Sequence, residues 1–483
     1  MTHRPILIRG GHVVVGSPRE GNVQLVDILI KDSVIREIAP RIDASDAEVI
    51  DASDSIVIPG FVDTHNHLWE AALRGITRDW SGIDFGWGMR YNHAPILSPD
   101  DIYSGTLAAA VSSLDAGFTT TIDHLHAVNS PEHARAGLRA ARESGIRTLW
   151  CYGLTDANPP VPVFGGAADR RDDLRTLRTE EFAGSKDTDR VVLGMATNDI
   201  GGVPWETIRE EYLLARELDL TITTHTDGVF EPGRRPEIEL LHADGLLGPR
   251  QVHSHANAIT DAELRLLADV GAGLSSTPEA ELQMGMGFPV FAQADRLGVN
   301  VGLGTDDQGN NSADPFMTMR VALHAENGRT FQPILEEAGF GALPDRPVTT
   351  LDALYFATLG GARAMGMGGI VGSLDIGKQA DVLIVSLVGV HQRPVVNPLS
   401  TLLMHSRPSD IRTVLVGGEI VKQSGTILGG LAERATRAVD SAWDSLSQQI
   451  EARGGHLPPR PPELMQQLQS APTAAVNTGA WKE

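Results

Sequence analysis

Two histidines separated by one residue close a short apolar stretch, PGFVDTHNH, at residues 59–67. Because successive side chains of a strand point to opposite faces, we expect His65 and His67 to share a face at one strand end. Two imidazoles placed in this way can bind a single divalent metal ion. An isolated pair is more often a strand edge without a ligand, so a metal site requires further ligands at other strand ends.

Ligands of the required types close two later apolar stretches. His225 lies in TITTHTD and Asp306 lies in GLGTD, each at the expected end of a strand. Three imidazoles and one carboxylate form a site for one Zn²⁺ or Fe²⁺ ion with an open position for water. Such an ion lowers the pKa of its water to about 7, which provides a hydroxide nucleophile near neutral pH. We therefore predict His65, His67, His225 and Asp306 as metal ligands.

A further histidine, His255, closes the stretch QVHSHA at residues 251–256. It is suited to polarise a substrate atom or to help move a proton, so we predict it to be catalytic, with Asp306 as the base. His253 shares its face, but the position of His255 relative to Thr260 and Asp261 makes His255 the better candidate.

The elements that must position these residues alternate between strands and helices. Apolar strand candidates lie at residues 60–67, 119–126, 147–154, 191–197, 220–227, 251–256, 273–277 and 299–306. Helix-start signals follow several of them, at Ser98, Ser130 and Thr260. Eight strands alternating with helices predict an α/β fold, a (β/α)₈ TIM barrel, in which active sites lie at the C-terminal strand ends.

Short β-branched runs flank this region on both sides, at residues 6–58 and 371–425. They predict a small β-sandwich built from both chain ends. The expected domains are one half of the sandwich at 1–59, the metal-dependent barrel at 60–370, the other half at 371–425, and a C-terminal helix with an extended tail at 426–483.

The composition limits the function classes. The 483 residues carry a formal net charge of −22, which argues against binding to nucleic acid or an anionic membrane. A single cysteine, Cys151, excludes an intramolecular disulfide. The first residues lack a signal-peptide core, and no stretch approaches the roughly 20 apolar residues of a membrane span. We expect a cytoplasmic enzyme for a small-molecule substrate. The extended tail would suit a homo-oligomer, a dimer or larger.

Several of these motifs together resemble the amidohydrolase superfamily, and more narrowly its triazine hydrolase, chlorohydrolase and cytosine/guanine deaminase branch. The resemblance covers about residues 5–425 and includes the stretch at 59–67, His225, HAN at 255–257, GLGTD at 302–306 and GSLDIGKQAD at 372–381. It implies one metal ion held by the four predicted ligands, with His255 catalytic. It also implies hydrolytic removal of an amino or other group from a ring carbon, or cleavage of a cyclic amide.

One position departs from the pattern of that branch. Many of its deaminases carry a glutamate three residues after the strand-five histidine, where it moves protons to the leaving nitrogen. Here the position is Gly228, and neither Asp227 nor Glu231 is in register. Glu279 and Glu281, in TPEAE, are candidates for the missing acid, and we include both among the predicted substrate-site residues.

Aromatic residues are concentrated in residues 68–95, although they make up only 5% of the chain. We predict that Trp87 and Tyr91 contact the substrate ring, whereas Trp80 and Phe85 anchor the loop. A second histidine pair lies in DHLH, in which we interpret His124 as a packing residue and His126 as a pocket residue. Met284, Met286 and Phe288 could line the same pocket.

The sequence therefore predicts a metal-dependent hydrolase that acts on a non-peptide C–N bond in a nitrogen heterocycle, cyclic amidine or cyclic amide. Within enzymes, the alternatives are displacement of halide or thiol and cleavage of a linear amide. Outside enzymes, the alternative is a ligand-binding barrel without turnover.

Overall fold

The computed structural model describes residues 4–155, 164, 166–226, 236–341, 345–460 and 462. Within this part of the chain, nine strands form one parallel sheet. Strands β6 to β13 are neighbours in chain order, and the last strand, β14, pairs with the first, β6. They are β6 (Phe61–His67), β7 (Phe118–Leu125), β8 (Arg147–Gly153), β9 (Val191–Ala196), β10 (Thr221–Thr226), β11 (Gln251–His255), β12 (Gly273–Ser276), β13 (Asn300–Leu303) and β14 (Asp306–Asp307).

The sheet closes through a strand that is broken in two. Strand β13 pairs with β12, whereas β14 pairs with β6, with Asp306 opposite Asn66. Only Gly304 and Thr305 separate β13 from β14, so the two pieces act as one eighth strand. The predicted α/β barrel is thereby confirmed.

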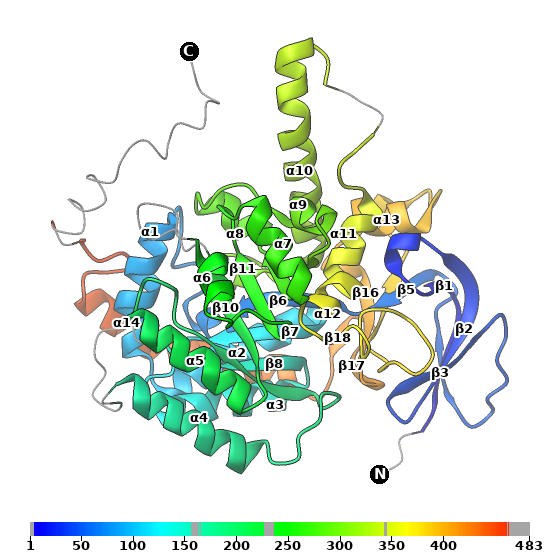
Figure 1. Cartoon of the computed structure of the whole chain (residues 1–483). Coiled ribbons are helices and arrows are strands. Elements are labelled where there is room, and N and C mark those ends of the chain that lie inside the picture. The colour runs from blue at the N-terminus through cyan, green and yellow to red at the C-terminus, as the bar shows by residue number, and fades with distance from the viewer. Residues whose placement is uncertain are drawn as a thin grey trace.

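Helices follow the strands and surround the sheet (Figure 1). They include α2 (Pro99–Asp115), α3 (Pro131–Ser144), α4 (Ala167–Glu181), α5 (Trp205–Glu217), α6 (Glu237–Ala243), α7 (Asp261–Val270), α8 (Pro278–Gln283), α9 (Phe291–Arg296), α10 (Pro315–Ala338), α11 (Thr350–Tyr355) and α12 (Gly361–Ala364). Ser98 and Thr260 form capping boxes with Asp101 and Glu263. Helix α3 also begins where predicted, although the Ser130 hydroxyl bonds to side chains rather than to the helix backbone.

The two ends of the chain share a second sheet, as predicted. Its strands are β1 (Ile6–Val14), β2 (Val23–Lys31), β3 (Val34–Ala39), β4 (Glu48–Asp51), β5 (Ser55–Pro59), β15 (Val382–Ser386), β16 (Ile411–Val416), β17 (Glu419–Gln423) and β18 (Thr426–Ile427). The N-terminal and C-terminal halves meet where β5 pairs antiparallel with β15. Buried residues of both halves, including Ile8, Ile28 and Ile384, form a separate core. This arrangement leaves the opposite end of the barrel, where β6 ends, for the candidate site.

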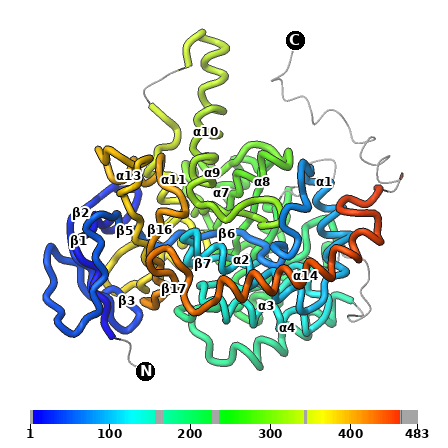
Figure 2. Tube along the Cα trace, turned by 180° about the vertical axis from the view of Figure 1, so that it is seen from behind, coloured from blue at the N-terminus to red at the C-terminus, as the bar shows by residue number. Residues whose placement is uncertain are grey.

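The last described helix, α14 (Leu431–Ala452), lies along α2 behind the barrel (Figure 2). The segment after it reaches the long connection that follows β6. That connection contains η2 (Leu68–Leu73), α1 (Gly82–Phe85), the π-helix η3 (Gly86–His93) and η4 (Ala94–Ile96). Helix α10 projects from the body of the molecule (Figure 1). None of the helices of the described residues is both long and apolar enough to cross a membrane.

Candidate metal centre

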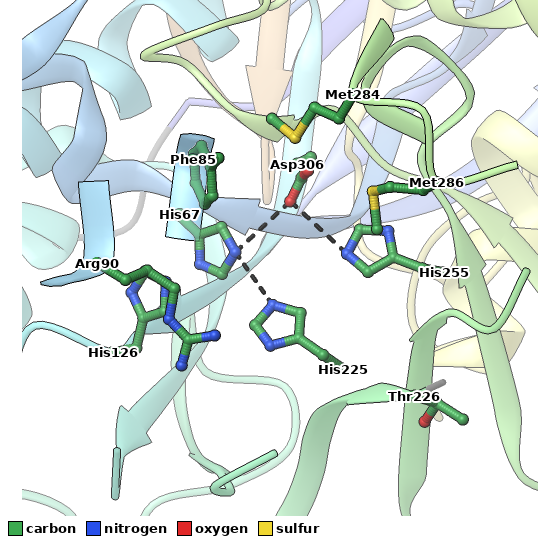
Figure 3. Close-up of a pocket in the computed structure, with 10 residues that line it drawn as sticks. All are labelled: His67, Phe85, Arg90, His126, His225, Thr226, His255, Met284, Met286 and Asp306. Carbon is green, nitrogen blue, oxygen red and sulfur yellow. Dashed lines mark hydrogen bonds and ion pairs between the residues drawn. The ribbon is translucent and has the colours of Figure 1, made fainter. Parts of the chain in front are cut away.

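Four donor atoms converge at the C-terminal ends of three barrel strands. Asp306 Oδ1 lies 3.2 Å from His65 Nε2 and 3.5 Å from His67 Nε2. His225 Nε2 lies 3.3 Å from His67 Nε2 (Figure 3). Ligands about 2.1 Å from a tetrahedral zinc ion lie about 3.4 Å from one another. The spacing of these atoms therefore fits a single divalent ion.

The other nitrogen of each imidazole contacts a partner, and for His67 and His225 that partner is an acceptor that selects the tautomer. His67 Nδ1 donates to His124 O at 2.8 Å, and His225 Nδ1 donates to Asp199 Oδ1 at 2.9 Å. His65 Nδ1 lies 2.9 Å from Ser254 Oγ, and its Nε2 has no hydrogen-bond partner among the described residues. Burial lowers the pKa of His65 to about 4, so the ring is neutral. The acceptors beside His67 and His225 leave the Nε2 lone pairs of these two rings free to bind a metal ion.

Backbone strain accompanies the site. Asp306 and His255 have φ values of 70° and 68°, in the left-handed region that non-glycine residues rarely adopt. Asp63 stabilises the approach to Asp306, because its carboxylate accepts hydrogen bonds from Thr305 N at 3.1 Å, Thr305 Oγ1 at 2.6 Å and Asn66 Nδ2 at 2.9 Å. This buried cluster joins β6 to the break in the eighth strand and so sets where Asp306 lies.

His255 lies next to the donor set. Its Nε2 is 3.9 Å from Asp306 Oδ1, and its Nδ1 is 3.0 Å from Thr277 Oγ1 and 3.7 Å from Glu281 Oε1. Burial alone would lower the pKa of His255, but Asp306 and Glu281 raise it above its usual value. The ring is thus suited to carry a proton beside the pocket.

A pocket opens above these atoms. Its lining residues are His67, Phe85, Arg90, His126, His225, Thr226, His255, Met284, Met286 and Asp306. Trp87 and Tyr91 are not among them; these two rings stack on each other at 4.8 Å, and Trp87 Nε1 donates to Pro458 O at 2.8 Å. In the described structure the apolar lining comes from Phe85, Met284 and Met286 instead.

The second histidine pair lies against the donor set. The His126 ring stacks on His67 with centroids 4.2 Å apart, and the His124 ring stacks on His225 at 4.5 Å. His67, Glu70 and His126 also bring three possible ligand atoms together. However, Trp69 Nε1 donates to His126 Nδ1 at 3.0 Å, so a neutral His126 carries its hydrogen on Nε2. That nitrogen is then a donor, which argues against a second metal ion there.

Sequence reasoning missed three ionisable residues around the pocket. Asp199, after β9, connects His225 to Arg90, whose Nη1 donates to Asp199 Oδ2 at 2.6 Å. Burial alone would raise the pKa of Asp199, but Arg90 and His225 lower it below its usual range. Glu70 is fully buried, and burial together with Asp307 raises its pKa well above its usual value. The feature of the sequence that could have pointed to Glu70 was its position, three residues after the predicted ligand His67.

The two glutamates predicted as replacement acids are not among the residues that line the pocket. Glu281 is fully buried and accepts hydrogen bonds from Thr277 N at 2.7 Å and Ser276 Oγ at 3.0 Å. Glu279 accepts a hydrogen bond from Thr318 Oγ1 at 2.8 Å. Asp227, Gly228 and Glu231 lie outside the described residues.

Glu279 predicts a pH-dependent stability. Burial raises its pKa from 4.5 to about 7. Between these two values the unfolded chain loses the proton while the folded chain keeps it, so folding stability falls as the pH rises from 4.5 to 7. We expect Glu279→Gln to be more stable than the parent by about 2 kcal/mol at pH 8 and similar at pH 4.5. Urea unfolding at both pH values measures this, with exposed Glu336→Gln as the control. An equal difference at the two pH values would contradict it.

A sequence profile of the amidohydrolase family matches residues 56–421. The chain is 28% identical over 464 residues to a 5'-deoxyadenosine deaminase of Methanosarcina barkeri, a match that covers 92% of this chain and 99% of the relative. An adenosine deaminase of Xanthomonas campestris with bound zinc has a similar fold, with a TM-score of 0.76, 24% identity and coverage of 90% of this chain and 98% of that one. For an atrazine chlorohydrolase of Arthrobacter aurescens complexed with zinc, the TM-score is 0.77 at 21% identity, with coverage of 91% and 100%.

Proposed function

Because the chain belongs to the amidohydrolase family, as its motifs predicted, we propose that it removes an amino group from a ring carbon of a small nitrogen heterocycle. The broader prediction, metal-dependent hydrolysis of a carbon–nitrogen bond other than a peptide bond, is confirmed by the family and by its deaminase relatives. The leaving group and the residues that act are our proposal. One observation carries it, namely that three contacts of 3.2–3.5 Å, His65–Asp306, His67–Asp306 and His67–His225, link the donor atoms of four side chains.

In this proposal His65, His67, His225 and Asp306 hold one divalent ion. A bound ion lowers the pKa of a coordinated water to about 7 and so makes a nucleophile available near neutral pH. The bound zinc of the deaminase and chlorohydrolase structures supports zinc as the first choice. Iron remains the alternative that the ligand types allow.

The side chains then move the protons. Water adds its oxygen to the ring carbon, and the carbon–nitrogen bond breaks to release ammonia. The Asp306 carboxylate, which neighbouring His255 and His65 keep ionised despite burial, accepts a proton from the water. His255 Nε2 donates to the negative charge that develops on the substrate, since Thr277 and Glu281 hold its Nδ1 side. Either group can pass a proton to the leaving nitrogen, which reduces the need for a carboxylate at position 228.

A substrate panel tests the reaction. Zinc-loaded and iron-loaded protein are each assayed with aminated, halogenated and cyclic-amide heterocycles of the same ring size. We expect ammonia release from the aminated members. Release of chloride alone, ring opening alone, or no turnover by protein that carries one equivalent of metal would contradict the proposal.

The catalytic role of His255 can be tested separately from metal binding. We expect His255→Asn to keep its metal while kcat falls about 10²–10⁴-fold, because the variant loses proton transfer but no ligand. Metal analysis and ammonia release measure the two effects. His253→Asn is the matched control, since His253 lies on the same strand, bonds to Thr226 and does not line the pocket. Loss of metal in His255→Asn would instead make His255 a ligand.

We also propose that the enzyme is a cytoplasmic homo-oligomer. The single buried cysteine is consistent with a reducing compartment. The projecting end of α10 exposes apolar side chains, with Leu335 at 46% and nearby Phe340 at 62%, which a second copy could cover. Light scattering of the purified protein measures its mass; a monomer at micromolar concentration would exclude the oligomer.

A further inference from the structure

The pocket has two chemically different sides. Arg90 and His126 lie beside His67, whereas Met284 and Met286 lie across the pocket, near Asp306 and His255 (Figure 3). The deamination chemistry uses neither Arg90 nor His126. A ligand that reaches the metal centre therefore meets a polar surface on one side and an apolar surface on the other.

The polar side presents hydrogen-bond donors. A guanidinium has five N–H groups, and Arg90 uses Nη1 on Asp199. Among the described residues, its other N–H groups donate to no protein acceptor, although the Arg90 side chain is only 12% exposed. His126 Nε2 carries a hydrogen because Trp69 Nε1 donates to its Nδ1, and it too has no hydrogen-bond partner there. His126 is 3% exposed, so this donor is unsatisfied within the protein.

The surrounding charges favour a neutral acceptor over an anion. Asp199 pairs with Arg90 and compensates its positive charge. Glu70 Oε1 lies 3.7 Å from His126 Nε2, and both Glu70 oxygens lack hydrogen-bond donors in the described structure. A carboxylate or phosphate on the substrate would lie close to the negatively charged Asp199 carboxylate and be repelled by it. A carbonyl oxygen accepts hydrogen bonds from the same N–H groups and brings no negative charge into the pocket.

The π-helix η3, which carries Arg90, is held by hydrogen bonds to the segment that follows α14. Trp87 Nε1 donates to Pro458 O at 2.8 Å, and His93 Nε2 donates to His456 O at 2.7 Å. Arg460 and Asp84 form an ion pair one turn before the π-helix. Arg90 is thus held in position before a ligand arrives, which favours specific recognition over general attraction.

We propose that Arg90 and His126 form a subsite for a neutral ring carbonyl, so that the substrate is an oxo-substituted aminoheterocycle. The inference rests on the proposed function for the reacting end of the substrate. Binding of the carbonyl would orient the ring with its amino-bearing carbon over the metal centre and its apolar edge against Met284 and Met286.

Matched ligands test this subsite by equilibrium binding to the zinc-loaded full chain. Cytosine and 4-aminopyrimidine differ at the C2 oxo group, and 4-aminopyrimidine-2-carboxylate places an anion at the same carbon. Guanine and 2-aminopurine form a corresponding purine pair. We expect the oxo compound to bind at least about 30-fold more tightly than its oxygen-free partner in one ring series, and the carboxylate to bind most weakly of the pyrimidines. Arg90→Met should reduce the preference to less than about threefold.

Two controls separate the possible failures. Arg78→Met alters an arginine of the same connection that is 90% exposed, and it should keep the preference. Arg90→Lys keeps a positive charge beside Asp199, so it should keep the metal and part of the preference for the oxo compound. This result would show that Arg90→Met loses recognition of the carbonyl rather than displacing His225. No binding in either series, an equal affinity for both members, or a preference for the carboxylate would overturn the subsite. Preference for the oxo compound without ammonia release would instead refute deamination and leave the subsite standing.

Discussion

His225→Ala is expected to purify with less than about a tenth of an equivalent of metal and to lose at least about 10⁴-fold in kcat/KM. In the proposed metal centre, His225 contributes one of four donor atoms, and a site with three ligands of this type binds an ion far more weakly. Its side chain is 11% exposed, so truncation leaves a smaller cavity than the same change at fully buried His65. Metal analysis after gel filtration, thermal melting and ammonia release measure the three consequences.

The control for this variant is His391→Ala. His391 Nε2 bonds to Asp410 Oδ2 at 2.9 Å, near the second sheet, and does not line the pocket. We expect that variant to keep its metal and its activity. If His225→Ala kept one equivalent of metal and its turnover, His225 would not be a ligand. Adjacent His124, whose ring stacks on His225, would then be the next candidate.

The barrel was predictable because its signals are local. Apolar runs of strand length, caps such as Ser98 and glycines at helix ends recur in the order that a (β/α)₈ barrel requires. Each predicted ligand could then be placed at the same end of the sheet, since parallel strands all end there. The structure brings His65, His67, His225 and Asp306 together accordingly. The break between β13 and β14 was not predictable, because it depends on the distant contacts of Asp63 with Thr305.

The pocket lining was harder to predict than the cluster of histidines and Asp306 at the strand ends. In residues 68–95, aromatic density alone cannot tell which rings face a substrate and which face the chain's own C-terminal segment. Trp87 bonds to Pro458, a contact between residues far apart in the sequence. Arg90 was overlooked because a single arginine in a loop has no characteristic spacing. Only the fold shows that it lies next to Asp199 and His126.

A second large effect is expected far from the chemistry, at the joint between the barrel and the second sheet. Asp381 lies just before β15, in the GKQAD motif, and Arg147 begins β8. Arg147 Nε and Nη2 each donate to Asp381 at 3.1 Å, Gly417 N donates to Asp381 Oδ1 at 2.7 Å, and both side chains are 1% exposed. We expect Asp381→Ala to lower the free energy of unfolding by about 3–5 kcal/mol, because it leaves the Arg147 guanidinium buried and unpaired.

Urea unfolding measures this loss against Asp172→Ala, which removes an exposed ion pair with Arg175 and should cost less than about 1 kcal/mol. Arg147→Met combined with Asp381→Leu should recover most of the stability, since no charge then remains buried. Arg147 lies at the start of its strand, whereas His65, His67 and Asp306 lie at strand ends. At 15 °C, folded Asp381→Ala should therefore keep its metal and its kcat. A fall in kcat with the fold and metal intact would show that the joint also positions the metal centre.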